Sequence, residues 1–308
     1  MATDVNTTAT AGLNAQRLTR AATYASVSVA FTLIVVKTGA WFATGAVVVL
    51  SSLLDSFLDA LASIVTLLAV RHAQTPADRE HRFGHGKAEP LAALAQSAFI
   101  MGSAVLLLFE AGNHIVHPTK VTQPGIGIAV MVVTIALTLG LVLFQRWVHR
   151  KTGSIAINAD SLHYKGDLFM NLAVIAALVL SGFFEWPYVD PIFAIAIALY
   201  IAANAWIIVR DALDMLMDRE LPEEERERIY AIAGSHPDAV CAHDLKTRRS
   251  GHTTFVQLHL EMDPSITLLR AHQIADEVEE MIRKAFPDSE IIIHQDPEGI
   301  DEMHQSFR

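Results

Sequence analysis

The sequence predicts an α-helical membrane protein with six transmembrane helices, followed by a small α+β domain with the element order αββαβ. Three observations predict this fold class. The 308-residue chain is 52% hydrophobic and only 18% charged, with a mean hydropathy of +0.35, whereas an average soluble domain is about 25% charged. Its apolar residues gather in long windows. Its acidic excess is confined to the last third.

The charge divides the chain into two parts. Residues 1–214 hold 13 acidic and 13 basic side chains, whereas residues 215–308 hold 20 acidic and 10 basic ones, which accounts for the whole net charge of −10. This negative charge excludes a nucleic-acid-binding protein, and the single cysteine, Cys241, excludes a disulfide scaffold. We interpret Cys241 as a small buried residue. Any metal site must therefore be built from histidine, aspartate and glutamate.

A membrane helix needs roughly 20 mostly apolar residues. Five windows satisfy this: 21–42, 47–70, 91–115, 126–147 and 186–209. A sixth window, 168–184, is too short unless its helix begins near Ser154, and the added half is then polar and must face protein or water. We expect a disordered segment at 1–16, a membrane domain at 17–214, a soluble domain at 215–298 and a tail at 299–308.

Basic residues give the orientation of these helices. The N-terminal segment and two loops on one side carry nine basic residues, and the three opposite loops carry only Lys120, which predicts that both termini are cytoplasmic. Lys37 lies in the first helix near its outer end, and we expect it to snorkel toward the membrane surface.

The soluble part begins with a helix that has Pro222 in its first turn and is expected to end near Gly234. Alternating residues predict strands at 240–247 and 253–262, joined by a turn at 248–251. An amphipathic helix at 265–286 and a short buried strand at 290–294 complete the αββαβ order, which favours helices on one face of a sheet.

Two pairs of ionisable residues lie at middle depth in the predicted membrane helices. Asp55 and Asp59, like His163 and Asp167, are four residues apart, which places both members of a pair on one helix face. A charged side chain at this depth costs roughly 2.5–3.5 kcal/mol. We therefore predict that the four converge on one divalent cation. Four protein ligands suit tetrahedral coordination, and the mixture of imidazole and carboxylate favours Zn²⁺ or Fe²⁺ over Mg²⁺, Ca²⁺ and Cu(I).

Two simpler interpretations compete with this site. Protonated acids can join helices by hydrogen bonds, or Lys165 can pair with Asp160 or Asp167. Alternatively, 154–167 is a surface loop rather than part of a helix. Neither explains the two aspartates in an otherwise apolar second helix. We leave Asp160 outside the metal site, as a residue that supports His163 or relays protons.

Four motifs carry a family resemblance. They are Leu-Leu-Asp-Ser-Phe-Leu-Asp (53–59), His-Arg-Phe-Gly-His-Gly-Lys-Ala-Glu (81–89), Leu-His-Tyr-Lys-Gly-Asp (162–167) and Ile-Ile-His-Gln-Asp-Pro (292–297). Together they resemble the cation diffusion facilitator family, in its bacterial ferrous-iron/zinc efflux branch. The resemblance implies a homodimeric, proton-coupled exporter of Zn²⁺, Fe²⁺ or Cd²⁺ in the bacterial inner membrane. It also implies a ferredoxin/metallochaperone-like cytoplasmic domain that binds metal.

The same resemblance implies two further metal sites. The spacing of Asp78, His81 and His85 in a polar loop favours by itself a solvated loop, but the family has a metal site at the matching residues. In the soluble domain, candidate ligands lie on three elements, and the resemblance implies a two-metal cluster bridged by Asp296. The members of this cluster are His243, His259, His272, His294 and Asp296.

The resemblance also pairs Lys87 with Asp218 across a hinge at the dimer contact, whereas the sequence alone leaves them as unrelated charges. We interpret His236, His252 and His304 as surface residues. The alternative function is a membrane metal sensor without transport, which would need the soluble cluster but not the buried quartet. A membrane metallopeptidase would need a motif such as His-Glu-x-x-His, which is absent from the sequence.

Overall fold

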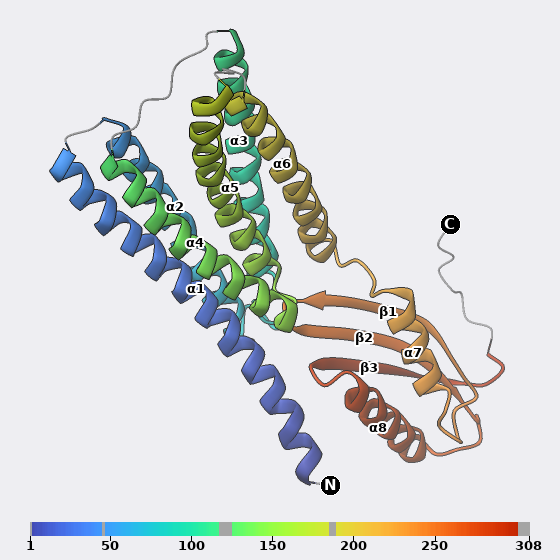
Figure 1. The fold of residues 1–308 in the computed structure, drawn as a ribbon. Coiled ribbons are helices and arrows are strands. Elements are labelled where there is room, and N and C mark those ends of the chain that lie inside the picture. The colour runs from blue at the N-terminus through green and yellow to red at the C-terminus, as the bar shows by residue number, and fades with distance from the viewer. Residues whose placement is uncertain (1, 45–46, 117–124, 185–188, 301–308) are drawn as a thin grey trace. The chain divides into compact units, whose positions relative to one another are not determined.

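The computed structural model describes residues 2–44, 47–116, 125–184 and 189–300 (Figure 1). It contains two compact units, which we describe separately. The membrane unit is Asn14–Leu213, and the C-terminal unit comprises Asp214–Arg308 together with Met1–Leu13. Most of the expected tail at 299–308 lies outside the described residues.

In the described part of the chain, six long helices precede the sheet of the C-terminal unit. They are α1 (Ala2–Thr44), α2 (Val47–Ala73), α3 (Ala88–Val116), α4 (Gly125–Thr152), α5 (Ile155–Phe184) and α6 (Val189–Leu216). Among the described residues, five of them are long and apolar enough to cross a membrane. The exception is α5, whose first half carries three charged residues. The predicted helical membrane domain is confirmed.

The N-terminal prediction is wrong. Helix α1 begins at Ala2, so residues 2–16, which we expected to be disordered, belong to a helix. This stretch contains no proline, and its four alanines favour helix. The helix continues without a break into the membrane-spanning part of α1.

Helix α5 begins where the sequence predicted. Gly153 has a positive φ of 67°, and the hydroxyl of Ser154 accepts a hydrogen bond from the backbone N–H of Ile157 at 3.3 Å, as an N-cap does. The interpretation of 154–167 as a surface loop is therefore wrong. Asp160, His163 and Tyr164 in this half are all buried, as expected for polar residues that face protein.

Helix α5 packs against α4 and α3 and also contacts α2. Alanines and larger aliphatic side chains alternate in its contact with α3 and α6, and the small residues among them allow helices in a membrane to approach closely. At Gly166 a Cβ atom would lie 2.9 Å from Cδ1 of Ile201 on α6, so only glycine fits without a shift. The outward faces carry large apolar side chains, as lipid contact requires, among them Phe31, Leu61, Phe109, Leu143 and Trp206.

The C-terminal unit is a three-stranded sheet with two helices. Its elements are α7 (Glu223–Ala233), β1 (Cys241–Ser250), β2 (Thr253–Met262), α8 (Leu268–Ala285) and β3 (Ser289–Pro297). The strand order is β1-β2-β3, with β1 antiparallel and β3 parallel to β2. The predicted αββαβ order is confirmed, although β1 and β3 are longer than expected and the turn is shortened to Gly251 and His252.

The core of this unit lies between the sheet and its helices (Figure 1). Ile229 of α7 and Val278 of α8 pack against Val256 and Leu258 of β2, and all four are buried. Because side chains alternate along a strand, His259 and Glu261 lie on the other face of β2. The helices thus cover one face, and the open face carries the candidate ligands.

Three predictions for this unit are wrong. Cys241 is exposed, because it lies at the start of β1 and outside the core. His236 is buried rather than at the surface, where its Nε2 lies 2.8 Å from Oε2 of Glu277 on α8. The strand β3 is only partly buried, with Ile292 exposed, since a sheet covered on one face buries alternate residues. His304 lies outside the described residues.

Candidate metal centres

The first candidate centre is a cavity inside the membrane unit. It has a volume of about 350 Å³, and it is lined by Asp55 and Asp59 of α2 and by His163 and Asp167 of α5, among others. The i, i+4 spacing aligns each pair on its helix, and the packing of α5 on α2 sets the two pairs facing one cavity.

Three of the four predicted ligands approach each other closely. Nε2 of His163 lies 3.0 Å from Oδ1 of Asp59 and 4.0 Å from Oδ2 of Asp167. The three ligand atoms of this group lie within 4.8 Å of one another, which is close enough to surround one ion. Asp55 lines the same cavity but is not part of this close group.

Tyr164 fixes the height of α5 against α2. Its hydroxyl lies 2.8 Å from the hydroxyl of Ser63, and both side chains are buried. Ser63 lies one turn beyond Asp59 on α2, and Tyr164 follows His163 on α5. This hydrogen bond therefore holds the imidazole and the carboxylate at the same depth.

Asp160 is separate from this group. Its Oδ2 accepts hydrogen bonds from Ser26 of α1 at 2.6 Å and from Gln145 of α4 at 2.7 Å, and the residue is completely buried. Lys165 forms no ion pair with Asp160 or Asp167 among the described residues, so the lysine-pairing interpretation fails. Asp160 joins three helices beside the cavity.

Lys37 was misjudged from the sequence. It does not snorkel: only 7% of the residue is exposed, and it lines the cavity of the four predicted ligands. Its Nζ donates to the carbonyl of Ser52 at 3.0 Å and to the hydroxyl of Ser56 at 2.7 Å. Only the hydroxyl of Ser56 could have indicated this contact, because Ser52 contributes its backbone carbonyl, and serines are common in membrane helices.

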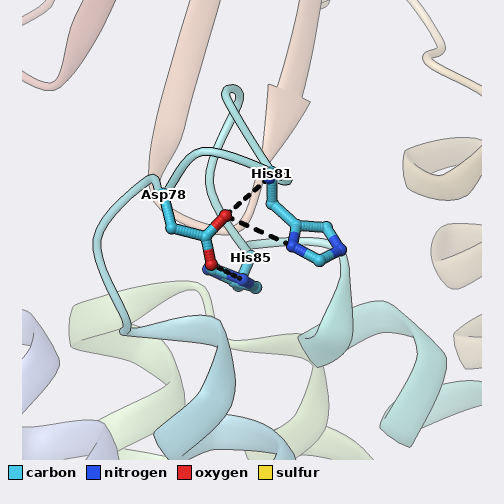
Figure 2. Close-up of side chains that lie close together, drawn as sticks. All are labelled: Asp78, His81 and His85. Carbon is cyan, nitrogen blue, oxygen red and sulfur yellow. Dashed lines mark hydrogen bonds and ion pairs between the residues drawn. The ribbon is translucent and has the colours of Figure 1, made fainter.

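The second candidate centre lies in the loop between α2 and α3 (Figure 2). Oδ1 of Asp78 is 3.5 Å from Nδ1 of His81, and its Oδ2 is 3.3 Å from Nε2 of His85. Asp78 also accepts the backbone N–H groups of Glu80 and His81 at 2.9 and 2.6 Å. These two bonds hold the pKa of the Asp78 carboxyl below its usual range, and the bond from His81 has the larger effect. The loop therefore presents an ionised carboxylate between two imidazoles.

A further histidine lies beside this site. The ring of His72, in the last turn of α2, is 4.5 Å from the ring of His85 in an edge-on arrangement. The spacing from His72 to Asp78 gave no recognisable ligand pattern, because the chain turns between them. His72 is not part of the close group formed by Asp78, His81 and His85.

The third candidate centre is on the open face of the C-terminal sheet. His243, His259 and His294 lie in one row across the three strands. The buried carboxylate of Asp296 lies among them, with Oδ2 at 2.7 Å from Nδ1 of His259 and 3.6 Å from Nε2 of His243, and Oδ1 at 3.2 Å from Nε2 of His294. This central position suits a carboxylate that serves more than one ion.

The structure changes the predicted membership of this cluster. His272 lies on α8, where its Nε2 is 3.5 Å from Oδ2 of Asp276, and not in the group around Asp296. Glu261, which we did not predict, has Oε1 3.4 Å from Nε2 of His243. Only the i, i+2 spacing from His259 could have indicated it.

The predicted partners Lys87 and Asp218 lie in different units. Lys87 is half-buried just before α3. Asp218 follows α6 with a positive φ of 57°, and its Oδ1 lies 3.4 Å from Nη1 of Arg248. Their pairing stays a prediction.

Comparison with known proteins covers nearly the whole chain. The profile of the cation efflux transmembrane domain matches residues 23–217, and that of the cation efflux protein cytoplasmic domain matches residues 221–298. Two similar curated proteins are both called cation-efflux pump FieF. The one from Shewanella oneidensis is 50% identical over 284 residues, 92% of this chain and 96% of that protein. The one from Escherichia coli O127:H6 is 48% identical over 281 residues, 91% and 93% of the two chains.

Among solved structures, the metal-bound C-terminal domain of the CzcD transporter from Thermotoga maritima is 25% identical, with a TM-score of 0.25, and the match covers 26% of this chain and 93% of that one. The profiles and the full-length relatives establish the assignment without it. This chain belongs to the cation efflux (cation diffusion facilitator) family, whose members are multi-pass membrane transporters and not enzymes.

Proposed function

We propose that this protein exports Zn²⁺ or Fe²⁺, and by the same chemistry Cd²⁺, from the bacterial cytoplasm in exchange for protons. Asp55, Asp59, His163 and Asp167 form its transport site. The observation that carries the proposal is the group of Asp59, His163 and Asp167, whose ligand atoms meet in a cavity of the membrane unit. Asp55 lines that cavity, and we assign it as the fourth ligand, drawn in when an ion binds.

The donor set determines which ions fit. One imidazole and three carboxylates give a tetrahedral nitrogen and oxygen site without thiolate, which suits Zn²⁺ and Fe²⁺ and is too soft for Mg²⁺. A sensor without transport would have no use for this cavity. A pump is the better explanation because a cavity between movable helices can open to each side in turn.

Moving a dication out of a cell with a negative interior costs about 4.6 kcal/mol per 100 mV, twice the value for a single charge. The sequence contains no phosphate-binding loop, so we assign the driving force to a proton gradient. Ligands must be deprotonated to bind a metal ion, and protons that enter from outside displace it. The same four residues thus couple the two fluxes.

The location of the protein, its assembly and the roles of the other candidate sites follow from this function. We place the protein in the inner membrane with both termini cytoplasmic, because basic residues gather on that side. We propose a homodimer held by the domain 215–298. This domain binds metal at His243, His259, His294 and Asp296, and we assign His272, which lies on α8 outside this group, as an additional ligand. Lys87 and Asp218 would pair at the hinge after the six-helix domain 17–214, and the Asp78 loop site would be accessory.

The test is metal flux into liposomes that contain the purified full-length protein, with an imposed pH gradient and Zn²⁺, Fe²⁺, Cd²⁺ and Mn²⁺ compared. Asp59→Ala and Asp167→Ala should each reduce flux to background while the protein still inserts and dimerises. Glu110→Gln is the matched control, because it removes a carboxylate from α3 outside the cavity. Flux near the wild-type level in both aspartate variants would contradict the site. Flux independent of the pH gradient would contradict the antiport.

A further inference from the structure

The cavity of the proposed transport site also contains a cationic side chain. Lys37 of α1 lines the same cavity as Asp55, Asp59 and Asp167, and only 7% of the residue is exposed. An ammonium group with so little access to water is costly unless acceptors and negative charges surround it. Both are present here.

The hydrogen bonds of Lys37 fix its ammonium group against α2. Nζ donates to the carbonyl oxygen of Ser52 at 3.0 Å and to the hydroxyl of Ser56 at 2.7 Å. These two serines flank Asp55 in the sequence, and Asp59 follows Ser56 by less than one turn. The positive charge is therefore held at the turn of α2 that carries the aspartates.

We propose that Lys37 is a built-in counter-cation of the transport site, which weakens the binding of the transported dication and speeds its release. This inference rests on the proposed transport function. In the empty cavity the ammonium offsets part of the charge of the three carboxylates. When a dication enters, the ammonium repels it, and this repulsion is stronger than between two exposed charges because Lys37 is shielded from solvent. A site of three carboxylates and an imidazole without this charge would hold its ion longer than export requires.

Two classes of variant separate the charge of Lys37 from its hydrogen bonds. Lys37→Gln and Lys37→Met remove the charge, and the second variant avoids burying an amide if the first folds poorly. Lys37→Arg keeps the charge. Ser56→Ala removes one hydrogen bond and leaves the ammonium in place. Arg20→Gln removes a positive charge from the same helix, roughly 25 Å away at 1.5 Å per residue.

The experiment is calorimetric titration of the full-length protein in detergent with Zn²⁺ and with Cd²⁺. Asp78→Ala, His259→Ala and Asp296→Ala are present throughout, so that the other two centres contribute as little as possible. The titration is done at pH 8, where protons compete least with the metal ion. Lys37→Gln and Lys37→Met should bind at least about tenfold more tightly than the parent, which corresponds to ~1.4 kcal/mol. Lys37→Arg, Ser56→Ala and Arg20→Gln should stay within about threefold of it.

Flux in liposomes supplies the second readout. Lys37→Gln should lower both KM and kcat, because tighter binding slows release, whereas a packing defect would lower kcat alone. Equal tightening in Lys37→Arg or in Ser56→Ala, or parental affinity in both uncharged variants, would overturn the inference. The added Asp59→Ala variant separates the two proposals: if it binds metal as the parent does, the transport site itself is wrong.

Discussion

Nε2 of His163 lies 3.0 Å from Oδ1 of Asp59, although 104 residues separate the two in the chain. Both side chains are largely shielded from solvent. The contact joins α5 to α2 at the candidate transport site, and it places the only nitrogen donor of the proposed quartet beside a carboxylate.

The first prediction concerns metal selectivity. His163→Asp makes the quartet all-oxygen and removes its only borderline-soft ligand, so transport should shift from Zn²⁺ toward Mn²⁺. The ratio of Zn²⁺ to Mn²⁺ flux should fall by about tenfold, the factor that one ligand change worth ~1.4 kcal/mol produces. A ratio equal to that of the wild type would show that residues outside the quartet set selectivity.

The second prediction separates the structure of the loop from its metal binding. Asp78→Asn keeps a side-chain oxygen for the N–H groups of Glu80 and His81 but loses the charge, whereas Asp78→Ala loses both. Both variants should lose about one metal ion per chain, measured by elemental analysis of purified protein. Only Asp78→Ala should make the loop more sensitive to protease. Unchanged metal content in both variants would leave this loop as a solvated turn.

The third prediction concerns the cluster around Asp296. Two copies of an acidic domain repel each other, and bound cations would offset that charge. Asp296→Ala together with His259→Ala should lower the metal content of a fragment 215–308 and weaken its dimerisation. The fragment has a hydrophobic core of its own. His252→Gln, at the far end of the β1-β2 hairpin, is the control. Sedimentation that is identical with and without chelator would rule out a role for metal in assembly.

The fourth prediction is a pH dependence of stability. The hydrogen bond from His236, with that from Arg270, lowers the pKa of the Glu277 carboxyl below its usual range. A carboxyl with a depressed folded-state pKa stabilises the fold above the unfolded-state pKa, and this contribution is lost as the pH falls through the folded-state value. The urea midpoint of the fragment should therefore fall below about pH 4.3, the unfolded-state pKa of glutamate.

Glu277→Gln should flatten that acid-side decrease, and Glu280→Gln, an exposed carboxylate of the same helix, should not. Urea unfolding between pH 3 and pH 6, followed by circular dichroism, measures both. A wild-type slope in Glu277→Gln would show that other carboxyls are responsible.

The sequence by itself determined the elements and their order. Apolar windows predict membrane helices because a span must satisfy its own backbone in lipid, and alternation with an amphipathic helix predicts the αββαβ unit. The i, i+4 spacing of Asp55 with Asp59 and of His163 with Asp167 also aligned each pair. All of these signals are local, since they depend on residues within one helix or one strand.

Only the tertiary structure decided which side chains meet. No local pattern sets the position of α5 along α2. The hydrogen bond between Tyr164 and Ser63 helps to fix this position. The burial of Lys37 in the cavity likewise depends on how α1 packs on α2. The rule for snorkelling applies to any lysine near the end of a membrane helix, because it takes no account of the neighbouring helices.

The strand β1 is another case in which the tertiary structure decides where a side chain points. Strict alternation from the buried Leu245 and Thr247 would turn His243 into the core. A bulge between His243 and Lys246, with Asp244 at a φ of 47°, adds one residue and turns His243 to the open face opposite His259. The sequence supplied the histidines, but the backbone irregularity that gathers them around Asp296 depends on pairing with β2, which is a property of the folded sheet.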